Sequence, residues 1–406
     1  MAETAEAEGA ARAFDIYDLP RSFLEDPFPT YHRLRDTDPV HRNRDGTWFI
    51  TRYEDVAKLY RTKTTFSDKT EMYVKKFGEG PLLEQHTKSM LFSDPPAHTR
   101  IRKLVAHAFT PRAMRSLEHR VVELVDDLLD RCERDGGMDL ITGFAFALPV
   151  EVICTMLGIP PSEREPLQRW SNAILTPLEP VATPEMVAKG NDAVAEFKQY
   201  LKELLDDRRV NPAKYGDDIL KQLTEAEEDG DRLTETELIQ NCIFMLNAGH
   251  ETTTNLVGNG VNALLDFDDQ LKLLRAQPDL IDGAVEEMLR FDSPLQIGNR
   301  GVSEPIDFGD VTLPAGTQIM TSIGGANRDP AQFSDPDRFD ITRKPNRHIA
   351  FAAGIHACLG APLARMEGTI AVGRLVERFP EIRRAGPARR GGRARFRGFV
   401  SLPVQV

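Results

Sequence analysis

The sequence is poor in cysteine, because only four of its 406 residues are of this type. They lie far apart, at Cys132, Cys154, Cys242 and Cys358, and none has the close pairing of zinc ligands. The first three fall in amphipathic or apolar helical patterns, which predicts buried core thiols. Such sparing use of cysteine is typical of a reducing compartment, so we expect a cytoplasmic protein.

The N-terminus lacks an apolar run. Residues 1–13 are small and acidic, with no basic segment ahead of a hydrophobic one, so we expect neither a signal peptide nor a membrane anchor. We expect these residues to form a disordered tail. Residues 14–406 lack a Pro/Ser-rich linker, a repeat and a low-complexity block, which predicts a single large domain.

An excess of positive charge is also missing. The formal net charge of −12 disfavours a nucleic-acid-binding protein and is typical of a soluble metabolic protein. The one strongly basic stretch, residues 383–397, is predicted to be a solvated loop and hairpin.

Strand patterns are short and scattered, whereas helical periodicity dominates. We therefore predict a mainly α fold with a small β region, with short strands near Val40, at 47–51 and at 294–302. Residues 66–92 show no clean period, so we expect a long loop there with at most a helical turn. The predicted helices are residues 26–38, 53–60, 97 onward, 113–134, 140–157, 162–175, 184–208 and 233–264.

The helix predicted at residues 233–264 is the longest. Thr234 and Glu237 form a capping-box pattern at its start, and its length would be roughly 45–48 Å at 1.5 Å per residue. Its apolar character runs nearly all round, which predicts burial. Its centre contradicts this pattern, since Gly249 costs about 1 kcal/mol relative to alanine and three threonines follow at 252–254. A buried helix that is least favourable at its middle indicates function there.

Two side chains in that middle can carry chemistry. The Thr252 hydroxyl can bond back to the Ala248 carbonyl and open the helix locally. Glu251 is an acid in an otherwise apolar segment. Taken alone, an acid–threonine pair is also compatible with a satisfied buried polar pair.

Residues 351–365, FAAGIHACLGAPLAR, form the second chemical stretch. Glycines at positions 354 and 360 permit a tight hairpin, and Pro362 falls in the first turn of the amphipathic pattern that follows. Cys358 therefore lies on a turn that leads into a helix N-terminus, where the dipole and free N–H groups favour a thiolate. A thiolate on such a loop is a metal ligand or a nucleophile, and a buried, inert thiol is the alternative.

The loop FAAGIHACLG at 351–360 resembles the haem-binding loop of cytochrome P450, and AGHETT at 248–253 resembles the oxygen-binding groove of the same family. The resemblance covers roughly residues 26–406, with four motifs in the family's order. It implies a triangular helical prism with a long central helix over the haem. It also implies a soluble, bacterial-type haem–thiolate monooxygenase, which puts one atom of dioxygen into an organic substrate and releases the other as water.

The resemblance also implies residue roles. The cofactor would be haem b with Cys358 as its axial ligand, a thiolate that favours O–O cleavage. Thr252 would bind the dioxygen and direct protons to it, and Glu251 would relay protons from solvent. The remaining assignments concern the haem: Phe351 would shield the sulfur, Gly354 would shape the hairpin, Gly360 would let the helix approach the porphyrin, Ala248 and Gly249 would leave space above it, and His98, Arg102, Arg300 and His356 would bind propionates.

A third group has a structural role by the same resemblance. Glu287 and Arg290 share one helix face, and charges in an apolar helix are costly unless they are paired. With Arg338 from a Pro-rich stretch they resemble the family's Glu-x-x-Arg and meander-arginine triad, which locks the core beside the haem loop.

The substrate is not identified by the sequence. The predicted pocket residues are mostly apolar, which favours a small or medium, largely apolar compound that is hydroxylated or O-dealkylated. The 66–92 segment covers the pocket in the family and carries lysines at 75, 76 and 88. These lysines either bind a carboxylate of the substrate or are solvated side chains of a surface loop. The predicted pocket residues are Phe244, Leu295, Gln296, Ile297 and Phe399.

The resemblance implies that two electrons come from NAD(P)H through ferredoxin reductase and ferredoxin. An acidic ferredoxin would dock on a basic patch on the cysteine side of the haem. Two alternatives stay open: a peroxygenase that uses hydrogen peroxide, which the intact Glu251–Thr252 pair disfavours, and a haem carrier or sensor without turnover. The candidate docking residues are Arg100, Lys103, Arg112 and Arg365.

Overall fold

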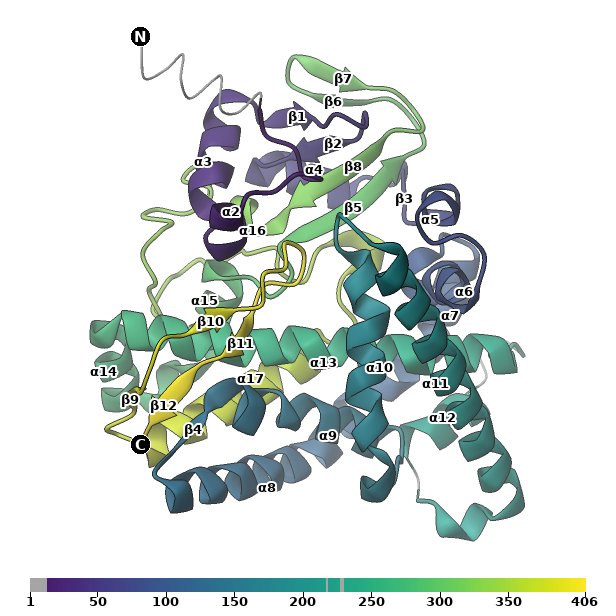
Figure 1. The fold of residues 1–406 in the computed structure, drawn as a ribbon, viewed down its shortest axis with the longest axis vertical. Helices are drawn as coiled ribbons and strands as arrows, with labels where there is room; N and C mark the ends of the chain where they lie inside the picture. The colour runs from purple at the N-terminus through teal and green to yellow at the C-terminus, as the bar shows by residue number, and fades with distance from the viewer. Residues whose placement is uncertain (1–12, 217, 227–229) are drawn as a thin grey trace.

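The computed structural model describes residues 13–216, 218–226 and 230–406. The predicted disordered tail lies outside these residues, apart from Ala13, which is in an exposed turn. Among the described residues no helix is long and apolar enough to cross a membrane. The fold is mainly helical, as predicted, and the helix α13 (Glu235–Asp266) crosses its middle (Figure 1).

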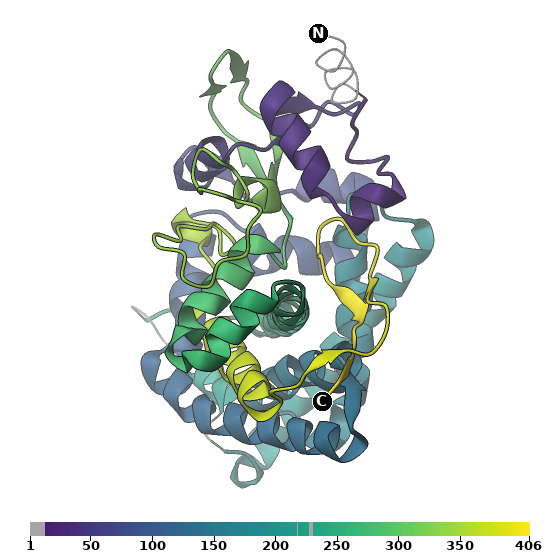
Figure 2. The ribbon, with the colours of Figure 1, turned by 90° about the vertical axis from the view of Figure 1, so that its left-hand side faces the viewer.

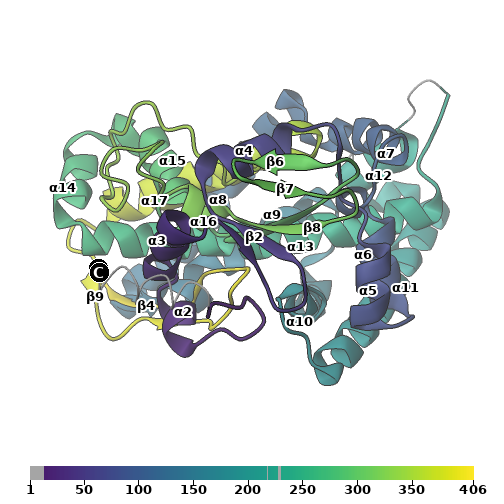
Figure 3. The same ribbon diagram turned by 90° about the horizontal axis from the view of Figure 1, so that it is seen from above.

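The β region is small. Its main sheet has the order β1-β2-β8-β5-β3, in which only β2 and β8 are parallel. Seen from above in Figure 3, this sheet and α4 (Tyr53–Arg61) lie over α13. All three predicted strands are present in it. The five strands are β1 (Val40–Arg42), β2 (Trp48–Ile50), β3 (Thr65–Phe66), β5 (Ile297–Val302) and β8 (Gln318–Ser322).

The other strands form small ribbons. One of them joins the C-terminus to the middle of the chain, because β12 pairs with β4 as well as with β9. The strands are β4 (Gly137–Asp139), β6 (Ile306–Phe308), β7 (Val311–Leu313), β9 (Arg383–Arg384), β10 (Arg389–Arg390), β11 (Phe399–Ser401) and β12 (Pro403–Gln405).

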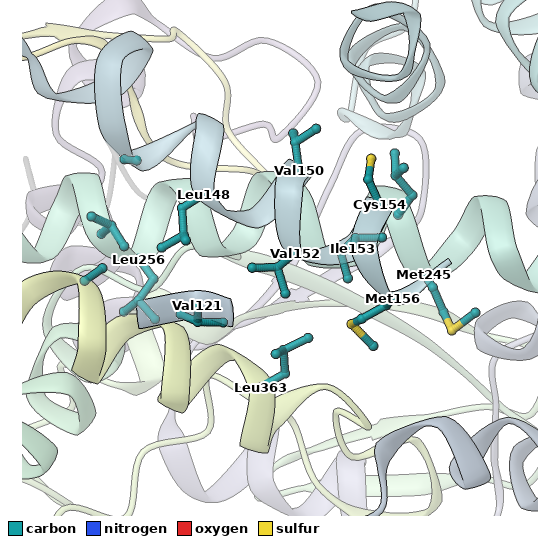
Figure 4. Packing of buried hydrophobic residues seen from close by; sticks show 14 of the residues in the cluster. Val121, Leu148, Val150, Val152, Ile153, Cys154, Met156, Met245, Leu256 and Leu363 are labelled. Carbon is teal, nitrogen blue, oxygen red and sulfur yellow. The ribbon is translucent and has the colours of Figure 1, made fainter. Parts of the chain in front are cut away.

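The largest core lies where α8 (Pro111–Asp135), α9 (Ala147–Met156), α13 and α17 (Ala361–Arg378) meet. Figure 4 shows Val121, Val152, Leu256 and Leu363, one from each helix, in this core. Because buried aliphatic side chains contribute about 1.5–3 kcal/mol each, this bundle fixes α13 firmly. In Figure 2 α13 is seen end-on, with the other helices around it.

The remaining helices surround this bundle. They are α2 (Arg21–Glu25), α3 (Phe28–Thr37), α7 (Ala97–Ala106), α10 (Glu165–Leu175), α11 (Pro184–Val210), α12 (Ile219–Glu225), α14 (Asp268–Ala276), α15 (Ile281–Phe291) and α16 (Ile323–Ala326). The short helical turns are η2 (His107–Phe109), η3 (Ile141–Ala145), η4 (Pro161–Glu163), η5 (Thr176–Leu178), η6 (Pro212–Lys214), η7 (Pro278–Leu280) and η8 (Gly354–His356). The helix predicted at 140–157 is therefore divided, with the π-helical turn η3 before α9.

The predicted loop at 66–92 is wrong. The segment forms α5 (Thr70–Phe77), α6 (Pro81–Lys88) and the turn η1 (Met90–Phe92). Each helix has only about two turns, which is too short for a 3.6-residue period to be recognised. Packing stabilises them, since the rings of Tyr73 and Phe77 stack with centroids 4.9 Å apart.

The predicted solvated tail at 383–397 is also wrong in part. Arg390 and Arg397 both pair with buried Asp292, at 2.8 and 2.9 Å. Burial opposes ionisation of Asp292, but these arginines hold its pKa below the usual value. The basic residues of the tail therefore attach the C-terminal loop to the end of α15.

Candidate functional site

The middle of α13 has one face that is not covered. Phe244, Ala248 and Thr252 are half-buried at intervals of four residues, on a helix whose other positions are mostly buried. Residues four apart lie on one helix face, so this face borders open space. The helix begins as predicted, with the Glu237 N–H donating to the Thr234 hydroxyl and the Glu237 carboxylate accepting from the Thr234 N–H.

The predicted local bond in this helix is present. The Thr252 hydroxyl donates to the Ala248 carbonyl at 2.6 Å. Since that bond uses the hydroxyl proton, the lone pairs of the Thr252 oxygen stay available as acceptors.

Gly249 also lies against a neighbouring helix. A Cβ atom placed on it would lie 3.0 Å from the Ile153 Cδ1 atom of α9. Its lack of a side chain therefore allows α9 and α13 to pack closely, while its role in leaving space above a haem stays a prediction.

Glu251 makes an ion pair that the sequence did not predict. Its carboxylate accepts from Arg393 of the C-terminal loop, and the Arg393 Nε lies 3.1 Å from a Glu179 oxygen. The other Glu251 oxygen, Oε2, is buried and has no hydrogen-bond partner within the described segments. Burial raises the pKa of Glu251, and Arg393 opposes the rise. The carboxyl group is thus poised to hold or give up a proton.

The cysteine loop has the predicted shape. The Cys358 N–H donates to the Phe351 carbonyl at 2.9 Å, which closes the hairpin. Gly354 has φ +73°, and a Cβ atom on it would lie 2.3 Å from the Tyr60 carbonyl oxygen, so only glycine fits. Helix α17 begins directly after Gly360, as predicted.

Cys358 differs from the other cysteines in its accessibility. Its side chain is exposed, whereas Cys132, Cys154 and Cys242 are buried, as predicted for core thiols. Although the residue is exposed on one side, the protein atoms around the sulfur partly desolvate it, and this desolvation raises the pKa of the thiol. The N–H groups of Gly360 and the following residue, with the Arg102 charge, oppose the rise. The dipole effect expected from the sequence is present but does not outweigh burial.

A group of basic side chains lies beside this loop. The rings of His98 and His356 have centroids 4.1 Å apart, and in the described part of the chain neither nitrogen of His98 has a hydrogen-bond partner. The Arg300 guanidinium lies over the Tyr60 ring and donates to the Asn299 carbonyl at 2.8 Å.

Arg102 completes this group by donating to the Ala357 carbonyl at 2.7 Å. Burial, together with the charges of His356 and Arg102, lowers the pKa of His98 to about 4. Buried donors without acceptors are costly, so the group as it stands fits an anion.

The charge cluster that includes Glu287 and Arg290 of α15 has a different third side chain from the one predicted. Arg290 binds both oxygens of Glu287, at 2.7 and 2.8 Å. The third side chain is Arg343, whose Nε lies 3.2 Å from both oxygens. The predicted Arg338 instead pairs with Asp269 at 2.9 Å and contributes only its carbonyl to the cluster.

The structure does not bring all predicted pocket residues to the open face of α13. Ile297 is fully buried in a cluster with Phe49 and Met320. The Gln296 amide donates to the Ser293 carbonyl at 2.9 Å. Successive residues of an extended chain point to opposite faces, so the prediction that the consecutive residues 295–297 all line the pocket is wrong for Ile297.

Phe244 lies on the open face, and the last two predicted pocket residues, Leu295 and Phe399, have mixed outcomes. Leu295 is half-buried and forms a β-bridge with Phe396. Phe399 lies under the Arg390 guanidinium, 3.8 Å from its ring centroid. It borders a cleft of about 610 Å³ that is also lined by Glu251.

Comparison with known proteins identifies relatives over nearly the whole chain. Residues 39–266 and 272–382 match the family model described as Cytochrome P450. The chain is 43% identical to Cytochrome P450 107B1 of Saccharopolyspora erythraea, over 96% of this chain and 98% of that protein. It is 42% identical to Vitamin D(3) 25-hydroxylase of Pseudonocardia autotrophica, over 89% of this chain and 88% of that protein.

A solved structure supports the same relationship. The fold resembles P450BioI in complex with hexadec-9Z-enoic acid ligated acyl carrier protein, with a TM-score of 0.90 and 36% identity. The match covers 96% of this chain and 100% of that one.

Proposed function

The chain belongs to the cytochrome P450 family and is a haem-dependent monooxygenase of organic substrates, and from this premise we propose how its residues serve the reaction. Cys358 is the thiolate ligand of haem b, and His98, Arg102, Arg300 and His356 hold its propionates. The substrate is a small or medium, largely apolar compound. Electrons come from NAD(P)H through ferredoxin reductase and ferredoxin.

One observation carries this proposal: the only exposed cysteine of the described residues lies beside basic side chains, among which both ring nitrogens of His98 lack a hydrogen-bond partner. The donor set fits the group that the family implies, since a soft thiolate suits iron and the unpaired His98 nitrogens suit carboxylates. The Phe351 ring, with Arg365 stacked on it at 4.6 Å, covers the cysteine loop.

Haem, when bound, supplies the dioxygen activation and the oxidising power. The chain's own residues supply positioning and protons. The Thr252 oxygen accepts a hydrogen bond from a water or a protonated oxygen atom in the open space, because its own proton is held by Ala248. Glu251 supplies protons from the other side of the helix once Arg393 releases its carboxylate. The apolar face around Phe244 keeps other water away.

The proposed ferredoxin site keeps only part of the predicted patch. Arg100 is bonded to Glu237 and lies 3.5 Å from Asp231, so its charge is compensated. Arg112 is exposed at the start of α8, and Arg365 is partly exposed although it pairs with Glu286. These two side chains support a smaller basic patch beside the cysteine loop.

Two measurements test the proposal in sequence. The first is the difference spectrum of dithionite-reduced protein with and without carbon monoxide, in which a thiolate ligand gives a strongly red-shifted Soret band. The second compares product formation with NADH, ferredoxin and ferredoxin reductase against formation with hydrogen peroxide alone. A normal band with peroxide-only turnover would favour the peroxygenase. Haem without that band and without turnover would favour the carrier or sensor.

Thr252→Ala is expected to separate electron use from product formation. Haem binding stays intact, while product per NADH falls on the order of tenfold and hydrogen peroxide rises. The reason is that the variant lacks the Thr252 oxygen, whose acceptor position orients the proton donor in the open space. The measurement is product, NADH and peroxide in the same reaction.

Thr254→Ala is the matched control, since its hydroxyl makes the same kind of bond, to the His250 carbonyl at 2.9 Å, at a buried position. It should leave the ratio of product to NADH unchanged. Equal ratios in both variants would contradict the role of Thr252.

A further inference from the structure

Lys69, at the start of α5, is a buried cation without a counter-ion. It is only 7% exposed, and among the described residues no carboxylate lies within ion-pair distance. Its ammonium lies 5.6 Å from the centroid of the Phe92 ring. The nearby Asp94 is already used, because its oxygens accept the N–H groups of Ser67 and Asp68 at 2.8 and 2.9 Å.

Two cations, Arg300 and Arg395, and two carboxylates, Asp94 and Asp68, act on Lys69 electrostatically. Arg395 of the C-terminal loop donates to the carbonyls of Leu178 and Ile297, both at 2.7 Å, and both acceptors are neutral. Burial lowers the pKa of Lys69 well below its usual value, and the charges of Arg300 and Arg395 lower it further.

Lys76 extends the same group. It lies seven residues after Lys69, two turns along α5 and on the same helix face. Its ammonium donates to the Glu179 carbonyl. Burial lowers the pKa of Lys76 to about 7, and Arg395 contributes to the change.

The carboxylates near this group are occupied, since Asp94 accepts the N–H groups of Ser67 and Asp68, and Asp68 accepts from Thr70. Glu179 accepts the N–H groups of Ala394 and Arg395, at 2.9 and 2.8 Å, and it also pairs with Arg393. Lys69, Lys76 and Arg395 therefore share no free anion. Burying unpaired cations is expensive, and a cluster of them is worse, so the arrangement fits an anion that enters from outside.

We propose that Lys69, Lys76 and Arg395 bind the carboxylate of the substrate, so that the enzyme oxidises an amphiphilic acid with a largely apolar body. This inference rests on the proposed function and specifies its substrate class. The sequence left open whether lysines of the 66–92 segment bind a carboxylate or are solvated. Lys75 and Lys88 are exposed, whereas Lys76 is half-buried and Lys69 is buried.

The position of Lys76 and Arg395 favours a substrate carboxylate over a haem propionate. Arg395 and Lys76 bond to carbonyls of the connection between α10 and α11, which Figure 1 shows close to β5 and the C-terminal loop. The propionate candidates His98, Arg102 and His356 lie instead beside the cysteine loop. Lys69 lies between the two groups, because the backbone beside it binds Asp94, which is 3.9 Å from His356, and the Arg300 charge also acts on it.

The first test measures the ligand-free holoenzyme. Lys69→Met removes a buried charge that has no partner, so its Tm should equal or exceed that of the wild type and haem retention should not change. Lys75→Met, at an exposed position of the same helix, is the control and should change neither. A lower Tm with faster haem loss in Lys69→Met alone would assign Lys69 to a propionate and overturn the inference.

The second test measures binding by calorimetry and by the spin-state shift of the haem. The probes are three pairs of an acid and its alcohol, with an alkyl, an aromatic and a terpenoid body. In at least one pair the acid should bind tenfold or more tightly than the alcohol. Lys69→Gln and Lys76→Gln should remove that preference, whereas Lys75→Gln keeps it.

An acid that binds no more tightly than its alcohol in all three pairs, or does not bind, overturns the inference. The reduced carbon-monoxide spectrum separates this failure from failure of the proposed function. A normal red-shifted band without acid preference leaves the proposed function standing, and a missing band removes its premise.

Discussion

Replacement of Cys358 by histidine is expected to abolish oxygen insertion while the protein still folds. The side chain is exposed, and its main structural contribution, the N–H bond to the Phe351 carbonyl, comes from the backbone. Histidine can hold haem iron, but it does not supply the electron density with which a thiolate favours O–O cleavage. We expect product formation to fall by more than about a hundredfold, because the activation free energy of O–O cleavage rises by several kcal/mol without the thiolate.

The measurement combines product analysis with the reduced carbon-monoxide spectrum. The variant should retain a haem band without the strong red shift. Cys154→Ala is the matched control, because it removes a buried thiol from α9 and should keep both the red shift and the activity. Full activity of Cys358→His, or loss of the red shift in the control, would contradict the assignment of Cys358.

Local features of the site could be predicted from the sequence. The bond from Thr252 to the Ala248 carbonyl depends on five consecutive positions of one helix, and the structure contains it. The hairpin at Gly354 depends on backbone angles that glycine permits, and φ is +73° there. Such features need no knowledge of distant residues, since neighbours along the chain decide them.

Features that join distant segments could not be predicted in the same way. Glu251 pairs with Arg393, which is 142 residues away in a tail expected to be solvated. The many basic residues of that tail predicted a solvated surface loop, whereas folding places several of them against buried carboxylates. Ile297 was predicted to line the pocket together with the two residues before it, but successive residues of an extended chain point to opposite faces, and folding places Ile297 in the core.

The short helices α5 and α6 show a further limit. Two turns give too little periodicity to separate a helix from a loop, and isolated helices of this length are unstable without tertiary packing. The buried ends of Lys69 and Lys76 follow from that packing. The cationic group that they form with Arg395 was therefore invisible in the sequence, where one member lies more than three hundred residues from the other two.

Removal of the Glu287 carboxylate is expected to destabilise the whole fold. Glu287 and Arg290 are both fully buried, and the same carboxylate also accepts from Arg343 and Asn346. Glu287→Ala leaves the Arg290 charge in the interior without its partner, which typically costs about 3–5 kcal/mol. That is a large share of the roughly 5–15 kcal/mol that stabilises a typical protein. The measurement is urea unfolding followed by circular dichroism and by haem absorbance.

A matched pair of variants tests the identity of the third member. Arg343 is 8% exposed and binds Glu287, whereas Arg338 is 56% exposed and binds Asp269 on the surface. Arg343→Ala should therefore lower the urea midpoint clearly, while Arg338→Ala should leave it nearly unchanged, since exposed ion pairs contribute little. The opposite order would restore Arg338 as the structural residue. Because Ala352 and Phe351 follow this irregular stretch closely in the chain, a weakened cluster should also loosen the cysteine loop, and haem should be lost before the helices unfold in Arg343→Ala alone.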